Sequence, residues 1–414
     1  MKTALIIGYV WPEPASSAAG SRMLQLIAAL QSGGYRVVFG SPADWSPHAV
    51  ALADYGVEAA KLQLNSSTFN DYIAGLQPDL VMFDRFMMEE QFGWRVEETC
   101  PNALRVLDME DVHSLRHARH QALKEGVEPG LKHIHSELAI REVAAVLRCD
   151  LALVISEFEW HWLQQQFQIP AAQLIYLPFM LLASQWQRPL TALSQRQHFV
   201  CIGNFRHEPN WDAVRWLREA LWPAIRQQLP TAELHVFGAY PPKKATSLQN
   251  EQLGFYVPGW ADDALEVVDS ARVMLAPLRF GAGLKGKLLD AAITATPAVT
   301  TPVGAEGMYG SAMGNQRDLG ILVADSATVF VDAAVQLYQN DSLWDTCSAA
   351  AVRLAPDRFA FADHAPRWLA RLSELAGNLE NHRLSGFYGA MLRHHTLKST
   401  RYMSQWIEAK NRLS

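Results

Sequence analysis

A glycine-rich segment with basic residues gives this sequence its clearest chemical signal. It runs from Ala276 to Gly307 and reads APLRFGAGLKGKLLDAAITATPAVTTPVGAEG. The pattern predicts a buried strand, a glycine-rich loop, a helix entered through that loop, and a second strand with another glycine turn. Glycines let a backbone approach a ligand closely, and a helix N-terminus beside a lysine attracts anions. The segment therefore predicts a phosphate site, although glycine turns and solvated lysines are also common in α/β domains.

The basic residues of this loop differ in how well they suit a phosphate. Lys285 stands at the expected helix entrance just past Gly281 and Gly283, where its charge and the backbone amides converge. Arg279 and Lys287 lie near the same loop but suit outward-facing positions equally well. Lys285 is therefore the leading candidate.

A second segment, FVCIGNFRHEPNWDAV at Phe199–Val214, predicts a strand ending at Gly203 and a helix starting near Asn210. Arg206 lies between them, on the side where strands of such a domain meet a cleft. This segment and the glycine-rich one, in this order, resemble the donor domain of retaining nucleotide-sugar glycosyltransferases of the GT-B fold, family four (glycosyl transferases group 1). The resemblance is to the branch that reads FGAG-x-KGK followed by an acidic residue.

The resemblance implies that a sugar leaves a nucleoside diphosphate whose negative charge grows as the glycosidic bond breaks. Fixed positive groups stabilise such a charge, and Arg206 and Lys285 are the implied catalytic cations. The other implied donor-binding positions lie in turns and at a helix start, and they are Gly203, Asn204, Gly259, Gly281, Gly283, Asp290, Glu306 and Gly307.

The sequence departs from the wider family at the donor site. Many members carry two glutamates separated by seven residues, and the corresponding positions here are Ala282 and Asp290. Asp290 can still accept hydrogen bonds from ribose hydroxyls, with a shorter reach. Many members also carry an Arg and a Lys on the phosphates, and these positions fall on Asn204 and Asn210. The phosphate role therefore rests more heavily on the two cations named above.

The first half of the chain is expected to bind the acceptor, as the resemblance implies. Asp111 and His113 lie where a strand passes into a helix, and the histidine suits an acceptor hydroxyl or a donor phosphate. Arg116 extends a basic helix that is either solvated surface or a contact for an anionic acceptor such as a lipid phosphate. Gly20 belongs to a small-residue loop that lets donor and acceptor approach.

Other polar groups of this half are weighed against structural roles. Asp84 and Arg85 follow a strand and suit either a structural pair or a substrate contact. His113, His117 and His120 share one helical face, but the outer two are about 10 Å apart along the axis, too far for one zinc ion. No metal and no cofactor are expected, because the phosphates would meet Lys, Arg and amides; the nucleotide sugar is a substrate.

Composition places the chain among ordinary globular proteins and narrows its partners. It has 414 residues, 49% hydrophobic and 19% charged, and a formal net charge of −6. The acidic balance makes nucleic acid an unlikely partner, because its binders usually carry a basic face. The four cysteines show no close pair and favour a reducing cytoplasm. The apolar run at the N-terminus is short, ends in Trp-Pro-Glu-Pro and is interpreted as a strand and not as a signal peptide.

Alternating strand and helix patterns predict an α/β protein of the GT-B kind, with two Rossmann-like, doubly wound parallel sheets facing a cleft. The strands expected in the first sheet are 3–8, 35–40, 59–64, 80–83, 104–107, 151–155 and 174–177. Those expected in the second are 198–202, 233–237, 255–257, 273–277, 298–301 and 321–323.

The same patterns divide the chain into four parts. They are an acceptor-binding domain at 1–180, a linker at 181–197, a donor-binding domain at 198–376 and a basic amphipathic helical tail at 377–414. The tail either packs back on the first domain or lies on an anionic membrane surface. The protein is expected in the cytoplasm, with peripheral contact to the inner face of the membrane in the second case.

The resulting hypothesis is a glycosyltransferase of glycan biosynthesis. It would move a sugar from a nucleoside diphosphate to an acceptor hydroxyl on a glycan, a lipid-linked saccharide or a protein, with retention of configuration. Two alternatives from other classes remain open. One is a nucleotide-sugar-binding protein that has lost turnover, which Ala282 and Asp290 make plausible, and the other is a nucleotide-sugar epimerase or hydrolase.

Overall fold

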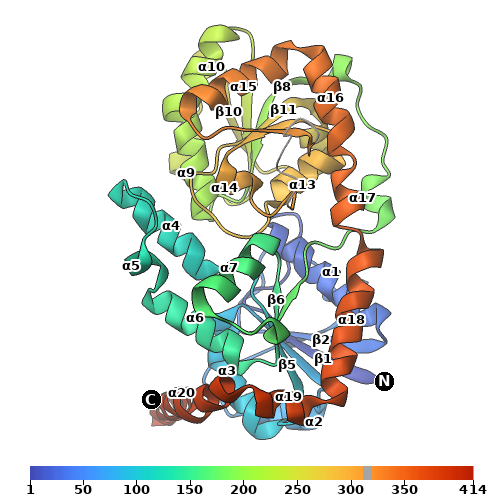
Figure 1. Ribbon diagram of the computed structural model, residues 1–414, viewed down its shortest axis with the longest axis vertical. Coiled ribbons are helices and arrows are strands. Elements are labelled where there is room, and N and C mark those ends of the chain that lie inside the picture. Colours follow the sequence, from blue (N-terminus) through green and yellow to red (C-terminus); the bar gives the residue numbers. More distant parts are fainter. Residues whose placement is uncertain (311–318, 414) are drawn as a thin grey trace.

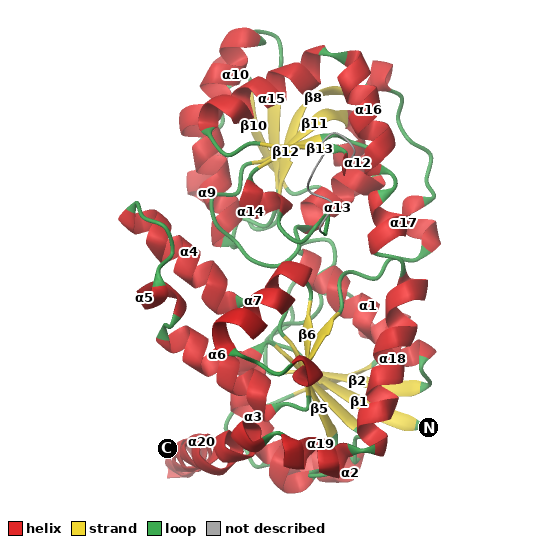
Figure 2. Cartoon of the chain, viewed as in Figure 1, coloured by secondary structure: helices red, strands yellow, loops and turns green. Residues whose placement is uncertain are grey.

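Two parallel α/β domains are stacked along the long axis of the computed structural model, which describes residues 1–310 and 319–413 (Figure 1). The first contains a seven-stranded sheet in the order β3-β2-β1-β4-β5-β6-β7, and the second a six-stranded sheet in the order β10-β9-β8-β11-β12-β13. Helices surround both sheets (Figure 2). The predicted GT-B architecture of two doubly wound parallel sheets is confirmed.

The strands of the first sheet are β1 (Lys2–Ile7), β2 (Tyr35–Ser41), β3 (Glu58–Lys61), β4 (Leu80–Asp84), β5 (Leu104–Asp108), β6 (Leu151–Val154) and β7 (Leu174–Tyr176). Those of the second sheet are β8 (Gln197–Ile202), β9 (Leu234–Phe237), β10 (Phe255–Gly259), β11 (Ala271–Ala276), β12 (Ala298–Thr300) and β13 (Ile321–Val323). Each predicted strand is present, with shifts of a few residues at the ends.

The helices that precede the second sheet are α1 (Ala18–Ser32), α2 (Thr68–Leu76), α3 (Phe86–Thr99), α4 (His113–Glu125), α5 (Leu131–Ile134), α6 (Glu137–Arg148), α7 (Glu157–Phe167) and α8 (Ala183–Trp186). Those that follow β8 are α9 (Glu208–Trp216), α10 (Trp222–Gln228), α11 (Lys243–Thr246), α12 (Ala264–Ser270), α13 (Gly286–Ile293), α14 (Pro302–Ala305), α15 (Ala327–Gln339), α16 (Asp341–Ala351), α17 (Leu354–Arg358), α18 (Phe361–Gly377), α19 (Leu379–Ser385) and α20 (Phe387–Leu413).

The central strands are apolar because both of their faces are covered by helices. In β1, the residues from Ala4 to Ile7 are fully buried, and β8 shows the same pattern from Phe199 to Ile202. At the start of α1, the Ser17 hydroxyl accepts a hydrogen bond from the backbone N–H of Gly20 at 3.1 Å, which caps the helix. These local rules fix the strand ends and the helix starts that carry the site.

The chain crosses between the domains twice, and the two crossings lie side by side. Leu181 donates its N–H to the carbonyl of Phe359 at 2.7 Å and accepts a hydrogen bond from the N–H of Phe361 at 2.8 Å. After the second crossing, α18 packs on α1, and Trp368 and Leu372 join the core of the first domain. The sequence patterns placed residues up to 376 in the second domain. That boundary is wrong, because the apolar face of α18 is buried against the first domain.

The tail packs back on the first domain, which is one of the two predicted arrangements. Helix α20 runs along α3 and α6. Arg383 of α19 donates to both carboxylate oxygens of Asp150 at 2.8 and 2.7 Å. Within the part of the chain that the structure describes, no helix is both long and apolar enough to cross a membrane.

Candidate active site

A cavity of about 180 Å³ lies between the two domains. Loops that follow β1, β4, β5, β8 and β9 form its walls, so the carboxyl ends of both sheets open onto it. Strand order reverses at β1 and β4 in one sheet and at β8 and β11 in the other, and ligands of such sheets bind at this crevice. Of the predicted site residues, Gly20, Asn204 and Arg206 line the cavity.

The predicted glycine-rich loop joins β11 to α13, and Lys285 is the residue at the start of that helix. Its side chain is buried, and Nζ donates to the carbonyls of Ala282 at 3.1 Å and Gly283 at 2.6 Å. Burial lowers the pKa of Lys285 to about 8, while Glu306 and Glu159 act in the opposite direction. Lys285 therefore brings a positive charge to the helix entrance and also holds the shape of the loop.

The loop requires its glycines because the first domain comes very close to it. Gly283 has φ of 66°, and a Cβ there would lie 2.8 Å from the Cβ of Asp111. Gly307 has φ of 75°, and a Cβ there would lie 2.2 Å from the hydroxyl of Ser156. Both contacts are shorter than a side chain tolerates, so these glycines allow the two domains to close on one another.

Glu159 of α7 connects the two domains directly. Its Oε1 accepts hydrogen bonds from the N–H of Gly283 at 2.7 Å and from the N–H of Val112 at 2.9 Å. Burial and the neighbouring carboxylate of Asp111 raise the pKa of Glu159 to about 7. The sequence did not single out this residue, because its partner lies 124 positions away.

A second interdomain link involves Arg119 of α4, which binds both carboxylate oxygens of Glu306 at 2.8 and 2.7 Å. The same guanidinium donates to the carbonyl of Gly281 at 2.8 Å. Glu306 was predicted to orient the donor, and here it holds the first domain against the glycine-rich loop.

The predicted acceptor-side residues form a network of their own on the neighbouring turn. Arg116 bonds to the carboxylate of Asp111, and the Nδ1 of His113 lies 2.9 Å from the carbonyl of Asp111. Burial acts to raise the pKa of Asp111, but Arg116 and His113 bring that pKa below its ordinary value. Arg116 and Arg119 are therefore committed to acidic partners, which leaves neither as a free cation for an anionic acceptor.

Lys287 proves to point inward, whereas Arg279 points outward and bonds to Asp212. The Nζ of Lys287 donates to the Oδ1 of Asn210 at 2.8 Å, and a Cβ on Gly203 would lie 2.9 Å from this Nζ. Burial lowers the pKa of Lys287. The position of Lys287 on the first turn of a helix that follows a glycine loop was a local signal for an inward-facing side chain. Its contact with Asn210 had no such signal, because Asn210 lies 77 positions away in the sequence.

Asn210 continues this arrangement toward the cavity. Its Nδ2 donates to the carbonyl of Asn204 at 3.0 Å, and the Oδ1 of Asn204 accepts from the N–H of Arg206 at 2.8 Å. The guanidinium of Arg206 lies 3.6 Å from the centre of the Tyr240 ring. The loop after β8 thus presents the exposed Arg206 at the cavity, and the part-buried Lys287 of α13 lies against the same loop.

Two further donor-side predictions have a defined setting. Asp290 lies on α13, where burial raises its pKa to about 7 and Lys287 acts in the opposite direction. Gly259 ends β10 with φ of 85°, and its carbonyl accepts the N–H of Gly238 at 2.6 Å. Neither is among the residues that line the cavity.

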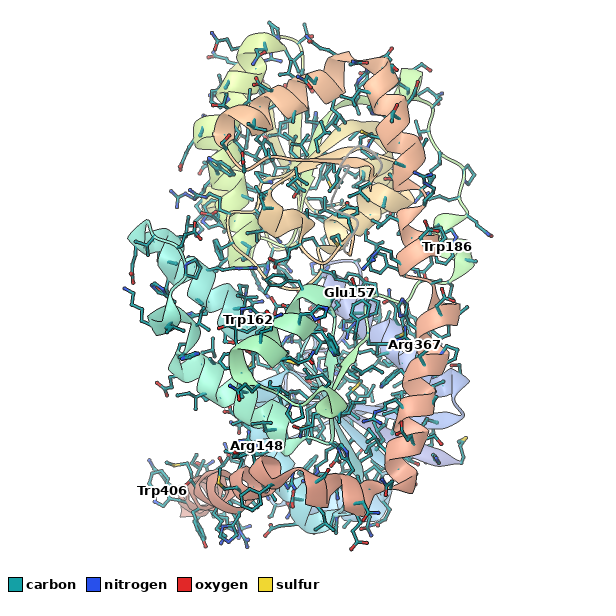
Figure 3. The ribbon with its side chains drawn as sticks, in the orientation of Figure 1. Arg148, Glu157, Trp162, Trp186, Arg367 and Trp406 are labelled. Atoms are coloured by element: carbon teal, nitrogen blue, oxygen red, sulfur yellow. The ribbon has the colours of Figure 1, made fainter. Side chains whose placement is uncertain are left out.

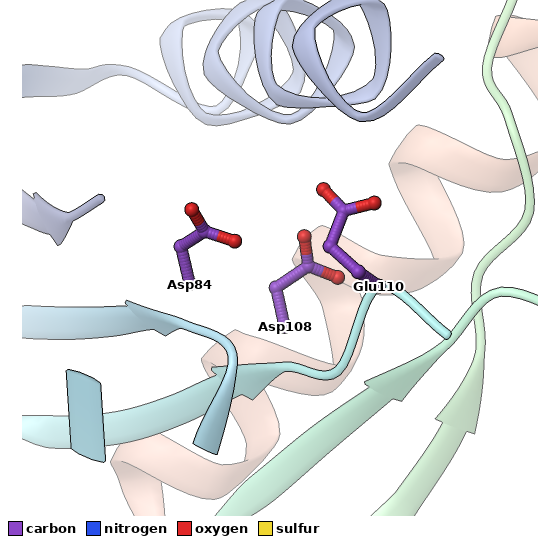
Figure 4. A group of neighbouring side chains, drawn as sticks. All are labelled: Asp84, Asp108 and Glu110. Atoms are coloured by element: carbon purple, nitrogen blue, oxygen red, sulfur yellow. The ribbon is translucent and has the colours of Figure 1, made fainter. Parts of the chain in front are cut away.

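Three carboxylates gather at the ends of β4 and β5, in an arrangement that the sequence did not predict (Figure 4). Asp84, Asp108 and Glu110 each offer one oxygen, and these oxygens lie within 4.8 Å of one another. Glu110 has φ of 60°, which is unusual outside glycine. Arg22 donates to Asp108 at 2.9 and 3.1 Å, and Arg85 lies 3.3 Å from Asp84. The predicted pairing of Asp84 with Arg85 is confirmed.

The segment that carries this donor-side geometry also has a family match. Residues 196–340 match the family model described as Glycosyl transferases group 1. This range begins just before β8 and includes the glycine-rich loop, Lys285 and Lys287. No curated protein matches the chain at a significant level.

Solved structures extend the comparison to both domains. A variant of TarM from S. aureus, in complex with fondaparinux, alpha-GlcNAc-glycerol and UDP, has a TM-score of 0.69 at 9% identity, covering 90% of this chain and all of the other. HepE from Anabaena, in complex with UDP-glucose, has a TM-score of 0.67 at 12% identity, covering 91% of this chain and all of the other. WaaG, a glycosyltransferase involved in lipopolysaccharide biosynthesis, has a TM-score of 0.60 at 13% identity, covering 88% and 98%. These likenesses show a shared GT-B fold.

Proposed function

We propose that this protein is a glycosyltransferase that moves a sugar from a nucleoside diphosphate to an acceptor hydroxyl. The observation that carries the proposal is the glycine-rich entrance to α13, where Lys285 bonds to carbonyls of its own loop and Lys287 lies against Gly203, just after β8, and Asn210 of α9. The family match over residues 196–340 supports it. The UDP and UDP-glucose named with the TarM and HepE structures also support it.

In this proposal the second domain holds the diphosphate. Lys287 and Arg206 approach it from two sides, and the amides at the start of α13 provide hydrogen-bond donors. Lys285 keeps these amides in position. No protein nucleophile is needed, because the leaving phosphate takes the proton of the acceptor hydroxyl while the cations stabilise its charge. The sugar keeps its configuration.

The decisive experiment is a thermal-shift panel with UDP, GDP, ADP and CMP and their common sugars. A ligand at a hundred times its dissociation constant stabilises the folded state by about 2.7 kcal/mol. We expect one diphosphate family to give this shift in the wild-type protein. Binding is expected to weaken at least tenfold in Lys287→Ala and to remain unchanged in Arg215→Ala, which alters an exposed pair on α9.

Two outcomes would redirect the proposal. If no nucleotide shifts the transition, nucleotide-sugar transfer is wrong. If a nucleotide sugar binds and is then cleaved with water at the same rate in the presence and absence of acceptors, the protein is a hydrolase. A double variant that exchanges Lys287→Asn with Asn210→Lys tests the phosphate role further, because it restores one lysine to the same contact and is expected to recover most of the binding.

We also propose that α20 rests on the surface of an anionic membrane. Large side chains project from its outer face, including Phe387, Tyr402 and Trp406, which is 60% exposed. Figure 3 shows Trp406 at the end of the molecule far from the second domain. The exposed Lys398 and Lys410 add charge that suits acidic lipids.

Flotation with phosphatidylglycerol vesicles tests this contact. We expect the protein to float with these vesicles and not with neutral phosphatidylcholine vesicles. Trp406→Glu combined with Phe387→Glu should abolish flotation without changing the thermal transition. Equal flotation of the variant and the wild type would contradict the proposal.

A further inference from the structure

We propose that Tyr240 is a positioning residue, which sets the guanidinium of Arg206 for the diphosphate when the two domains close. The inference rests on the proposed function and deepens it, because it says how closure controls one of the proposed phosphate cations. Tyr240 lies in the loop after β9 of the second domain, and it lines the cavity together with Arg206. Its contacts on two sides carry the inference.

On one side, the ring of Tyr240 supports the guanidinium of Arg206. The guanidinium carbon lies 3.6 Å from the centre of the ring, well within the range of a cation–π contact. The N–H of Phe205 donates to the carbonyl of Ala239 at 3.1 Å, so the two loops are joined one residue before each member of this pair. A flat ring fixes the plane of the guanidinium, while the N–H groups at its edge can still bind oxygens of a ligand.

Other arginines near the cavity are held in a different way. Arg116 and Arg119 each pair with a carboxylate. Within residues 1–310 and 319–413, Arg206 forms no such ion pair, and its guanidinium lies over an aromatic ring instead. A carboxylate partner offsets the charge of a guanidinium, whereas a neutral ring orients it and leaves the charge in place. Arg206 therefore keeps its positive charge for an anionic ligand, and the direction of that charge depends on Tyr240.

On the other side, the hydroxyl of Tyr240 reaches the first domain. It donates to the carboxylate of Glu13, in the loop after β1, and lies 3.0 Å from each of its oxygens. Ser16 donates to the same carboxylate at 2.5 Å, and Ser46 donates to it as well. Burial acts to raise the pKa of Glu13, but the three hydroxyls bring that pKa below its ordinary value. Glu13 is thus an ionised acceptor that hydroxyls of its own domain orient toward Tyr240.

A histidine of the first domain also contacts the ring. His48, in the loop after β2, lies edge-on to Tyr240 with ring centres 5.0 Å apart, and it stacks on Trp260 of the second domain at 4.1 Å. The backbone of Tyr240 has φ of 56°, a conformation that persists in a non-glycine residue where its surroundings hold it. Opening the cleft would remove the contacts with Glu13 and His48. The ring, and with it Arg206, would then be free to turn.

A double-mutant cycle on diphosphate binding tests the inference. The probes are UDP, GDP and ADP, and isothermal titration calorimetry measures the Kd of the one that the wild-type protein binds. Tyr240→Leu should raise this Kd about tenfold, because the guanidinium loses its support. In an Arg206→Ala background the same substitution should change the Kd less than about twofold, since no guanidinium is left to orient. The control Tyr55→Leu, at an exposed tyrosine of the first domain, should leave the Kd unchanged.

A conservative variant separates the two contacts of Tyr240. Tyr240→Phe keeps the ring under Arg206 and loses the hydroxyl, so it should raise the Kd only about threefold. In a Glu13→Ala background Tyr240→Phe should have no further effect, because the hydrogen bond that it removes is already absent. A role of Tyr240 in folding alone would give the same loss in both backgrounds.

The outcomes separate this inference from the proposed function. If the wild-type protein binds none of the three diphosphates, the proposed function fails, and this inference fails with it. If one of them binds, the inference is overturned by an unchanged Kd in Tyr240→Leu, or by additive effects of Tyr240→Leu and Arg206→Ala, and the proposed function stands. A native thermal transition shows that each variant is folded. Should Tyr240→Leu lack one, the pair Tyr240→Phe and Glu13→Ala decides, because additive effects of these two would also contradict the inference.

Discussion

The two sides of the interdomain cleft use opposite chemistry at equivalent places. At the strand ends of the second domain, glycines bring the backbone forward and Lys285, Lys287 and Arg206 supply positive charge. At the strand ends of the first domain, Asp84 and Glu110 present carboxylates. The same doubly wound sheet thus places basic residues on one side of the cleft and acidic residues on the other. The difference lies in the loops, because both sheets place their strand ends alike.

Replacing Lys285 with alanine should have the largest effect, because it breaks the basic side of this comparison. The variant loses a buried charge and the two hydrogen bonds that hold the carbonyls of Ala282 and Gly283. We expect sugar transfer to fall by about two to three orders of magnitude. Steady-state rates with the donor found by thermal shift measure this. Arg279→Ala, which alters an outward-facing partner of Asp212, serves as the control. A wild-type rate in Lys285→Ala would remove the central assignment.

Breaking the link between the two sides should have a smaller effect. Arg119→Ala leaves Glu306 without its ion pair and frees the carbonyl of Gly281. We expect the KM for the donor to rise about tenfold, because the part-buried Glu306 then lacks its partner and the domains close less readily. Small-angle scattering should show a larger radius of gyration for the variant. An unchanged radius and an unchanged KM together would mean that this ion pair does not hold the domains closed.

The smallest expected effect is a change in the free energy of unfolding with pH, which tests the buried acidic groups near the cleft. Burial raises the pKa of Glu110 to about 8, and the pKa values of Glu159 and Asp290 to about 7. These groups bind protons more tightly in the folded state than in the unfolded chain. The free energy of unfolding should therefore fall as the pH rises from about 5 to about 8.

Urea titrations at several pH values measure this slope. Glu159→Gln should flatten part of it, because glutamine keeps an oxygen acceptor for the N–H of Gly283 but does not titrate. A control substitution of Glu128, which is exposed, should leave the slope unchanged. A free energy of unfolding that rises over this range would contradict the assigned direction.

Local sequence signals predicted the fold and the glycine-rich entrance to α13. The strands follow from apolar runs between turn residues. Lys285 was expected at the start of a helix, and it lies there, because a glycine loop before a helix is a local pattern. Tertiary contacts were not accessible in this way. The contact of Lys287 with Asn210, and those of Arg119 and Glu159 with the glycine-rich loop, join residues that only the closed fold brings together.

The carboxylate cluster shows the same limit from another side. Asp84 was visible as a polar residue at a strand end, and its pair with Arg85 was expected. The position of Glu110 beside Asp84 and Asp108 was not expected, because it depends on a left-handed backbone conformation two residues after β5. A glutamate gives no sequence signal for that conformation.

The paired crossings at Leu181 and Ala360 also determine how the molecule can move. Two strands of chain joined by backbone hydrogen bonds resist twisting and sliding more than a single linker does, while they still allow bending. The two paired segments therefore form a hinge that favours bending about one axis. A bending motion of this kind would keep the two sides of the cleft in one relative orientation.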